Sequence, residues 1–134
     1  MQKALILTNG LLSTDNAKTA HGLIRGTERY QIVGIIDPPT AGQDAGEVLD
    51  GKHRQIPIFD TVSSAINQLQ QVDCLIIGIA TPGGIMPLDM LDVIKAAIQS
   101  GISIVNGLHD YLTANLELVA LAEKHQVTLT DIRK

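Results

Sequence analysis

The residues from Cys74 to Ile79 constrain the fold of this chain more than any other stretch. Six consecutive apolar or small residues, with no polar residue between them, are typical of a strand buried on both faces in a parallel sheet. The run is followed by Thr81-Pro82-Gly83-Gly84, where the proline removes a ladder donor and the glycines permit unusual dihedral angles. Since ligands bind beyond the carboxyl ends of such strands, the sequence predicts a central strand that ends in a binding loop.

The remaining apolar stretches alternate between strand-like and helix-like patterns. Stretch 40–55 has little periodicity and is predicted to be a long loop, and Pro57 places the strand around it near a sheet edge. This alternation predicts one three-layer α/β/α Rossmann-like domain over 1–134, with a mostly parallel sheet of five to six strands. The further strands are expected at 4–7, 31–36, 56–59, 102–105 and 127–132, and the helices at 14–25, 62–70, 88–100 and 115–125.

The helix at 88–100 has a regular apolar face. Its members are spaced for the 3.6-residue period, so they are expected to point inward. They are Leu88, Leu91, Ile94, Ala97 and Ile98.

Composition excludes several classes of function. A net charge of −4, with one Phe, two Tyr and no Trp, offers neither a basic surface nor stacking side chains for nucleic acid. The single cysteine, Cys74, allows neither a disulfide framework nor a multi-cysteine metal site, and is expected to be a buried, inert thiol. No apolar run approaches the roughly 20 residues of a membrane helix, and the N-terminal run is too short for a signal peptide. We expect a cytoplasmic protein without nucleic acid or membrane partners.

The first loop lacks the glycine pattern of a dinucleotide-binding site. Gly10 follows the first strand, but no G-x-G-x-x-G pattern does, so a standard NAD pyrophosphate site is not expected. Asp37 ends the second strand, where a Rossmann fold places the carboxylate that binds a ribose hydroxyl. An aspartate before two prolines is also a frequent turn former, and the pattern leaves both roles open.

Two further stretches are candidate anion sites. Lys18 and Thr19 fall in the first turn of a predicted helix, where free N–H groups and the dipole favour an anion. The alternative is a solvated lysine and an ordinary helical threonine. Thr81, Gly83 and Gly84 could bind a phosphate or carboxylate through backbone donors, or could simply form a turn.

The loop after the strand at 102–105 contains the one candidate for acid–base chemistry. His109 and Asp110 are adjacent there, and a histidine beside a carboxylate can act as an acid or base. Adjacent side chains often diverge, so this pair is a candidate and no more. No histidine, cysteine or carboxylate spacing predicts a metal site.

Four separated groups of residues together resemble the N-terminal Rossmann-like domain of a bacterial and archaeal family of unknown function, some members of which are D-glutamate N-acetyltransferases. The resemblance covers nearly the whole chain. The groups are AKTAHG at 17–22, Asp37 with GEVL at 46–49 and IPI at 56–58, IGIATPGG at 77–84, and GLHDYL at 107–112 with DIR at 131–133.

This resemblance implies a second, P-loop-like domain in full-length members, whereas this sequence contains no G-x-x-x-x-G-K-[ST]. It therefore implies acyl transfer only for the two-domain protein, with this chain as its ligand-binding half. The layout from 33 to 84 also resembles the CoA-binding domain of the succinyl-CoA ligase alpha subunit. An acyl-CoA ligand such as acetyl-CoA would reconcile both resemblances, and a nucleotide is the alternative ligand. We expect the loops at 8–18, 37–51, 81–84 and 106–110 to line one cleft.

Two other functions stay open at this stage. The first is an NAD(P)-binding oxidoreductase module, which Asp37 favours and the missing glycine pattern disfavours. The second is a non-catalytic self-association domain, which exposed apolar residues around 88–91 or 116–121 would support. A homo-oligomer is expected on general grounds, because most soluble oligomers are of this kind.

Overall fold

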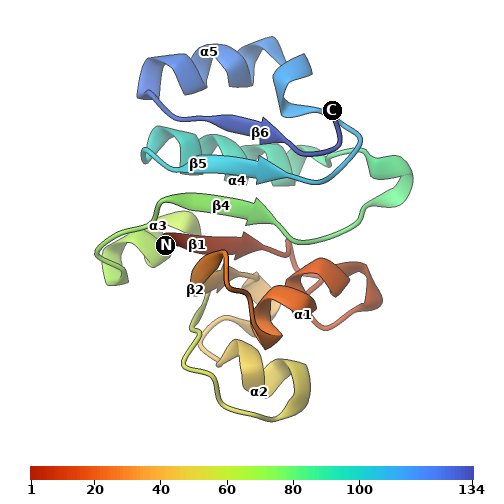
Figure 1. Cartoon of the computed structure of the whole chain (residues 1–134), viewed down its shortest axis with the longest axis vertical. Coiled ribbons are helices and arrows are strands. Elements are labelled where there is room, and N and C mark those ends of the chain that lie inside the picture. Colours follow the sequence, from red (N-terminus) through yellow and green to blue (C-terminus); the bar gives the residue numbers. More distant parts are fainter.

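The computed structural model describes all 134 residues, Met1–Lys134. Its strands form a single parallel sheet of six, in the order β3-β2-β1-β4-β5-β6 (Figure 1). The predicted mostly parallel sheet is thereby confirmed. The strands are β1 Gln2–Leu7, β2 Tyr30–Ile36, β3 Ile58–Phe59, β4 Cys74–Ile77, β5 Ser103–Asn106 and β6 Leu129–Asp131.

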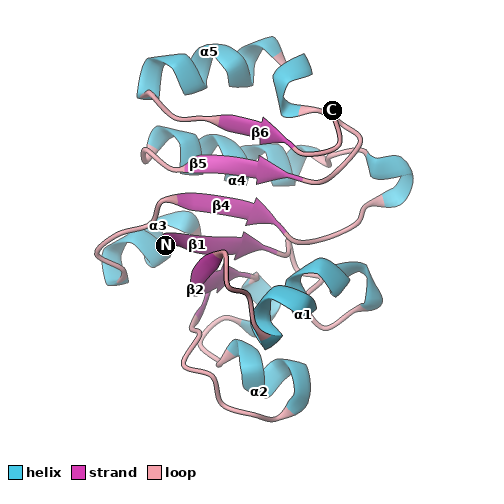
Figure 2. Cartoon of the chain, in the orientation of Figure 1, coloured by secondary structure: helices cyan, strands magenta, loops and turns pink.

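Five α-helices connect the strands and cover both faces of the sheet (Figure 2). Helix α1 packs beside α2, whereas α4 packs beside α3 and α5, as right-handed crossovers require when the strand order reverses at β1. This is the three-layer α/β/α Rossmann-like fold that the sequence predicts. The helices are α1 Lys18–Arg25, α2 Ala45–Asp50, α3 Val62–Gln68, α4 Leu88–Gln99 and α5 Leu116–His125, with 3₁₀ turns at Asp15–Ala17, Pro38–Thr40, Pro82–Gly84 and Leu112–Ala114.

Strand β4 lies between β1 and β5, and all four of its residues are buried. The central strand predicted from the apolar run is confirmed, although the ladder ends at Ile77 and not at Ile79. The thiol of Cys74 is buried as expected, and burial raises its pKa to about 11. The core is aliphatic apart from Phe59.

The prediction that residues 40–55 form a long loop is wrong, because this stretch contains helix α2. The Asp44 carboxylate caps this helix by accepting a hydrogen bond from the Glu47 amide, and Gly51 ends it at φ +83°. Residues 42–44, just before this helix, run antiparallel along the outer side of β3. The Gly42 amide donates there to the carbonyl of Ile58 over 2.9 Å. The short strand β3 is at the sheet edge, as Pro57 predicts, and this segment covers it.

Leu88 does not point inward, which corrects one part of the predicted face of α4. The buried stripe of this helix contains Met90, Ile94, Ala97 and Ile98. At 100° per residue Leu88 lies about 200° away from Met90, so it faces solvent and is 80% exposed. None of the helices has the length and apolar character needed to cross a membrane.

Gly78 allows α1 to lie very close to the sheet. A β-carbon at this position would lie 2.5 Å from Cγ2 of Ile6 and 3.0 Å from Cβ of Ala20, both of which are fully buried. The approach is fixed by backbone hydrogen bonds, one from the Ala20 amide to the Gly78 carbonyl (3.1 Å) and one from the Ala80 amide to the Asn16 carbonyl (2.8 Å).

The close approach at Gly78 predicts that Gly78→Ala lowers the free energy of unfolding by about 1–3 kcal/mol, because the added methyl group overpacks the contact. Urea unfolding measures the change. Gly22→Ala is the matched control, since nothing lies within 4 Å of its added carbon, and it should stabilise α1 by about 0.5–1 kcal/mol. Equal effects of the two substitutions would contradict the packing argument.

Candidate functional site

A cleft of about 440 Å³ opens at the carboxyl ends of β4 and β5, beside the point where the strand order reverses. Ligands of open α/β sheets bind at this place. Five of the residues predicted from the sequence line it together, although they come from three separate parts of the chain. They are Lys18, Thr19, Thr81, Gly84 and His109.

Lys18 and Thr19 enter the cleft from the first turn of α1. The backbone hydrogen bonds on either side of Gly78 hold this turn against the end of β4. The Lys18 ammonium has no carboxylate within ion-pair distance, and it donates no hydrogen bond inside the protein. Lys18 is exposed, so its charge is free to meet an anion.

The glycine loop has the unusual backbone that the sequence predicts, with φ of +66° at Gly83 and +71° at Gly84. Its donors are largely used within the protein. The Gly84 amide donates to the Thr81 carbonyl (2.9 Å), and the Thr81 hydroxyl donates to the Ile85 carbonyl (2.6 Å). The loop therefore shapes one wall of the cleft, and its Gly84 amide is not free to hold a phosphate.

Asp110 joins the glycine loop to the loop after β5. Its carboxylate accepts a hydrogen bond from the Met86 amide (2.9 Å), and its own amide donates to the Gly84 carbonyl (3.2 Å). Asp110 does not line the cleft, and it does not orient the neighbouring His109. His109 remains exposed beside Gly84, where it is a candidate base without a carboxylate partner.

Asp37 and Gly10 lie outside the cleft. Asp37 is 1% exposed, and its carboxylate accepts hydrogen bonds from the hydroxyls of Thr8 (2.7 Å) and Thr40 (2.5 Å) and from the Leu12 amide (3.2 Å). Of the two roles left open by the sequence, this geometry is that of a loop-forming residue. Gly10 has φ +88° and turns the same loop, close to Pro39. The expectation that 37–51 lines the same cleft is wrong, since none of its residues is found there.

The segment after β6 contributes cleft residues that the site prediction omitted. Arg133 lines the cleft together with the predicted residues, and its Nε donates to the Gly107 carbonyl. Just before it, the Asp131 carboxylate accepts hydrogen bonds from Asn106 Nδ2 (2.8 Å) and from the amides of Leu112 (2.9 Å) and Thr113 (3.1 Å). The only sequence signal was the DIR motif at 131–133, to which no role was assigned.

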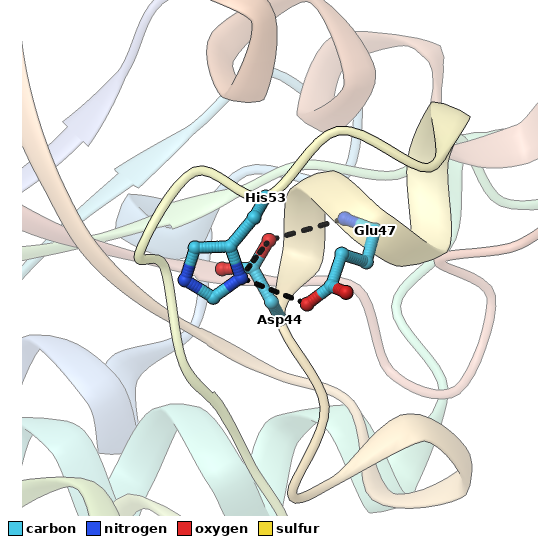
Figure 3. Close-up of side chains that lie close together, drawn as sticks. All are labelled: Asp44, Glu47 and His53. Atoms are coloured by element: carbon cyan, nitrogen blue, oxygen red, sulfur yellow. Dashed lines mark hydrogen bonds and ion pairs between the residues drawn. The ribbon is translucent and has the colours of Figure 1, made fainter.

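The stretch 42–57 forms a second pocket, of about 540 Å³, away from the cleft. One ligand atom each from Asp44, Glu47 and His53 lies within 4.8 Å of the other two (Figure 3). The Asp44 carboxylate already accepts hydrogen bonds from the amides of Glu47, Arg54 and Ile56, which outweigh its burial and lower its pKa. His53 Nδ1 pairs with the Glu47 carboxylate at 2.8 Å, which raises the His53 pKa. The three could hold a metal only by giving up contacts that fix α2 and its loop.

The buried contacts of Asp37 predict that Asp37→Asn lowers the free energy of unfolding by about 2 kcal/mol, because an amide NH₂ group replaces one of its accepting oxygens. Chemical denaturation measures the change. Asp60→Asn, on an exposed carboxylate without hydrogen bonds, should leave stability unchanged. If Asp37 served only a bound ribose, its substitution would weaken ligand binding and leave unfolding unaltered.

The hydrogen bonds to Asp131 also predict a pH dependence of stability. Burial alone would raise the pKa of Asp131, but its hydrogen bonds outweigh burial and hold the pKa below the ordinary 3.8. The carboxylate therefore stabilises the fold fully above pH 3.8, and this contribution is lost as the pH falls through the lower folded-state pKa. The free energy of unfolding of wild type should exceed that of Asp131→Asn by about 1–3 kcal/mol near pH 7, and this difference should disappear in acid. A gap that stays constant with pH would contradict this.

Known proteins similar to this chain fall into two groups. A D-glutamate N-acetyltransferase from Pseudoalteromonas is 40% identical over 80 residues, which is 54% of this chain and 24% of that protein. The crystal structure of a DUF1611 family protein from Anabaena variabilis is 35% identical, with a TM-score of 0.88 over 100% of this chain and 38% of that one. This chain thus spans about a quarter to two fifths of the length of these relatives.

More distant structures share only the fold. A biliverdin reductase from Synechocystis, solved with biliverdin and NADP+, has a TM-score of 0.56 at 17% identity, covering 96% of this chain and 37% of that one. An oxidoreductase from Bacillus cereus has a TM-score of 0.62 at 15% identity, covering 98% of this chain and 34% of that one.

The family match is more specific than these structural similarities. Residues 38–134 match the Rossmann-like domain described as "Domain of unknown function (DUF1611_N)". This range contains β3 to β6 and the loops that follow β4 and β5. The order and spacing of the four groups of residues at 17–133 predicted this result. The chain belongs to the DUF1611_N family of Rossmann-like domains.

Proposed function

We propose that this chain is the ligand-binding, N-terminal half of a D-glutamate N-acetyltransferase-like protein, and that its cleft holds the phosphates of an acyl-CoA or a nucleotide. The observation that carries this proposal is the pair of cations without carboxylate partners, Lys18 and Arg133, in one cleft at the carboxyl end of the sheet. Asp15 is the only carboxylate among the residues that line it. A volume of about 440 Å³ is in the range of small-molecule sites.

In the longer protein, the proposed reaction is acyl transfer from acetyl-CoA to the amine of an acidic amino acid. This step needs a base to remove a proton from the ammonium group and donors to stabilise the developing oxyanion. His109 is the candidate base from this chain. Since the Gly84 amide and the Thr81 hydroxyl are used within their loop, the oxyanion donors would have to come from the partner domain that the family resemblance implies. We therefore expect the isolated domain to bind ligand and not to turn it over.

An NAD(P)-binding oxidoreductase module is the second candidate. The strand order is that of dinucleotide-binding folds, and this observation favours it. Against it, the first loop lacks the glycine pattern, and Asp37 is occupied by Thr8, Leu12 and Thr40. A third candidate is self-association without ligand, which the exposure of Leu88 (80%) and Leu116 (82%) favours.

The proposed function predicts that CoA or acetyl-CoA raises the melting temperature of this chain in a thermal-shift series that also contains ATP, NAD, NADP and D-glutamate. A ligand at a concentration one hundred times its Kd raises the free energy of unfolding by about 2.7 kcal/mol. Lys18→Gln should weaken the binding about fivefold, by removing one charge worth roughly 1 kcal/mol. Lys124→Gln, an exposed site on α5 outside the cleft, is the matched control.

The same series separates the candidates. A shift with NAD or NADP alone would favour the oxidoreductase module. No shift with any ligand would contradict the proposed binding function, and a dimeric mass by sedimentation would then favour self-association.

A further inference from the structure

The backbone around Arg133 is fixed on both sides of that residue. The amide of Ile132 donates to the Asn106 carbonyl (3.0 Å), and the Tyr111 hydroxyl donates to the Arg133 carbonyl (3.0 Å). Asp131 anchors the start of the segment through four hydrogen bonds, including one of 2.8 Å from the Thr113 hydroxyl. These contacts fix the backbone position of Arg133 beside the loop after β5.

The guanidinium of Arg133 is oriented but only partly used. Its Nε donates to the Gly107 carbonyl, which lies in the loop after β5. The two terminal nitrogens donate to no protein acceptor, and no carboxylate lies within ion-pair distance. The nearby Asp131 carboxylate forms no ion pair with Arg133, and its oxygens accept hydrogen bonds from Asn106, Leu112 and Thr113.

An arginine held in this way is suited to phosphate. A guanidinium presents its terminal N–H groups in one plane, and this fork matches two phosphate oxygens. Lys18 adds a second charge to the same cleft from the other side of the sheet's reversal point, at the start of α1. Two cations with a single carboxylate among the lining residues favour a ligand group with more than one negative charge.

We infer that Arg133 binds the ligand directly, and that the cleft clamps a doubly charged phosphate or pyrophosphate group between the Arg133 guanidinium and the Lys18 ammonium. This inference rests on the proposed function, because it specifies the ligand group that the cleft recognises.

The test compares Arg133→Gln with wild type in calorimetric titrations with three probes. CoA carries the phosphates and the thiol arm, pantetheine carries only the arm, and inorganic pyrophosphate carries only the charge. Arg133→Gln should weaken the binding of CoA and pyrophosphate about tenfold, which is about 1.4 kcal/mol, and leave pantetheine unchanged. Lys134→Gln is the matched control, because Lys134 bonds to Thr113 and does not line the cleft.

Arg133→Lys keeps the charge without the planar fork, so it should retain part of the lost affinity. Melting of each unliganded variant is measured first, and if Arg133→Gln does not fold, the lysine variant decides. Unchanged CoA and pyrophosphate affinity in the folded variant would overturn the role of Arg133 while leaving the proposed function intact. A wild-type chain that binds neither CoA nor pyrophosphate would overturn the proposed function itself.

Discussion

The contact of α1 with β4 at Gly78 determines where a ligand can bind. Backbone hydrogen bonds join the Ala20 amide to Gly78 and the Ala80 amide to Asn16, so the start of the helix lies directly on the end of the central strand. In a dinucleotide-binding fold, glycines of the first loop provide the close approach that a pyrophosphate needs. Here the close approach is between helix α1 and the chain directly after β4, at Gly78. The open space is consequently displaced toward β5, where the cleft lies.

Hydrogen-bonded carboxylates organise the loops at this end of the sheet, and none of them forms an ion pair with the cations of the cleft. Asp37 holds the first loop, Asp110 joins the glycine loop to the loop after β5, and Asp131 fixes the segment after β6. Each accepts at least one backbone N–H, so its charge is compensated by dipoles and not by a lysine or arginine. Lys18 and Arg133 are therefore left without carboxylate partners at the cleft. The electrostatics of the site follow from how its scaffold is built.

The sequence predicted the regular parts of the fold and only some of the site. Apolar runs locate the strands, because burial on both faces excludes polar residues, and the order of elements specifies the layers. The helix α2 was missed because its six residues are too few to show a period, although Asp44 and Gly51 mark its two ends. Leu88 was misplaced because periodicity alone does not say which of two overlapping stripes faces the sheet. The role of Arg133 could not be predicted from a local motif, because the parallel pairing of β6 with β5 brings this residue to the cleft.

The position of Asp37 shows why the fold alone does not specify the ligand. The residue occupies the place of a ribose-binding carboxylate at the end of β2, but its oxygens accept from Thr8, Leu12 and Thr40, and it is 1% exposed. A nucleotide bound in the standard manner would have to displace these contacts, each worth about 1.5–3 kcal/mol for a charged acceptor. A ligand held by its phosphates between the first turn of α1 and the segment after β6 displaces none of them. The internal bonds of the loops thus favour a binding mode on the β5 side of the reversal point, with the anion as its recognised group.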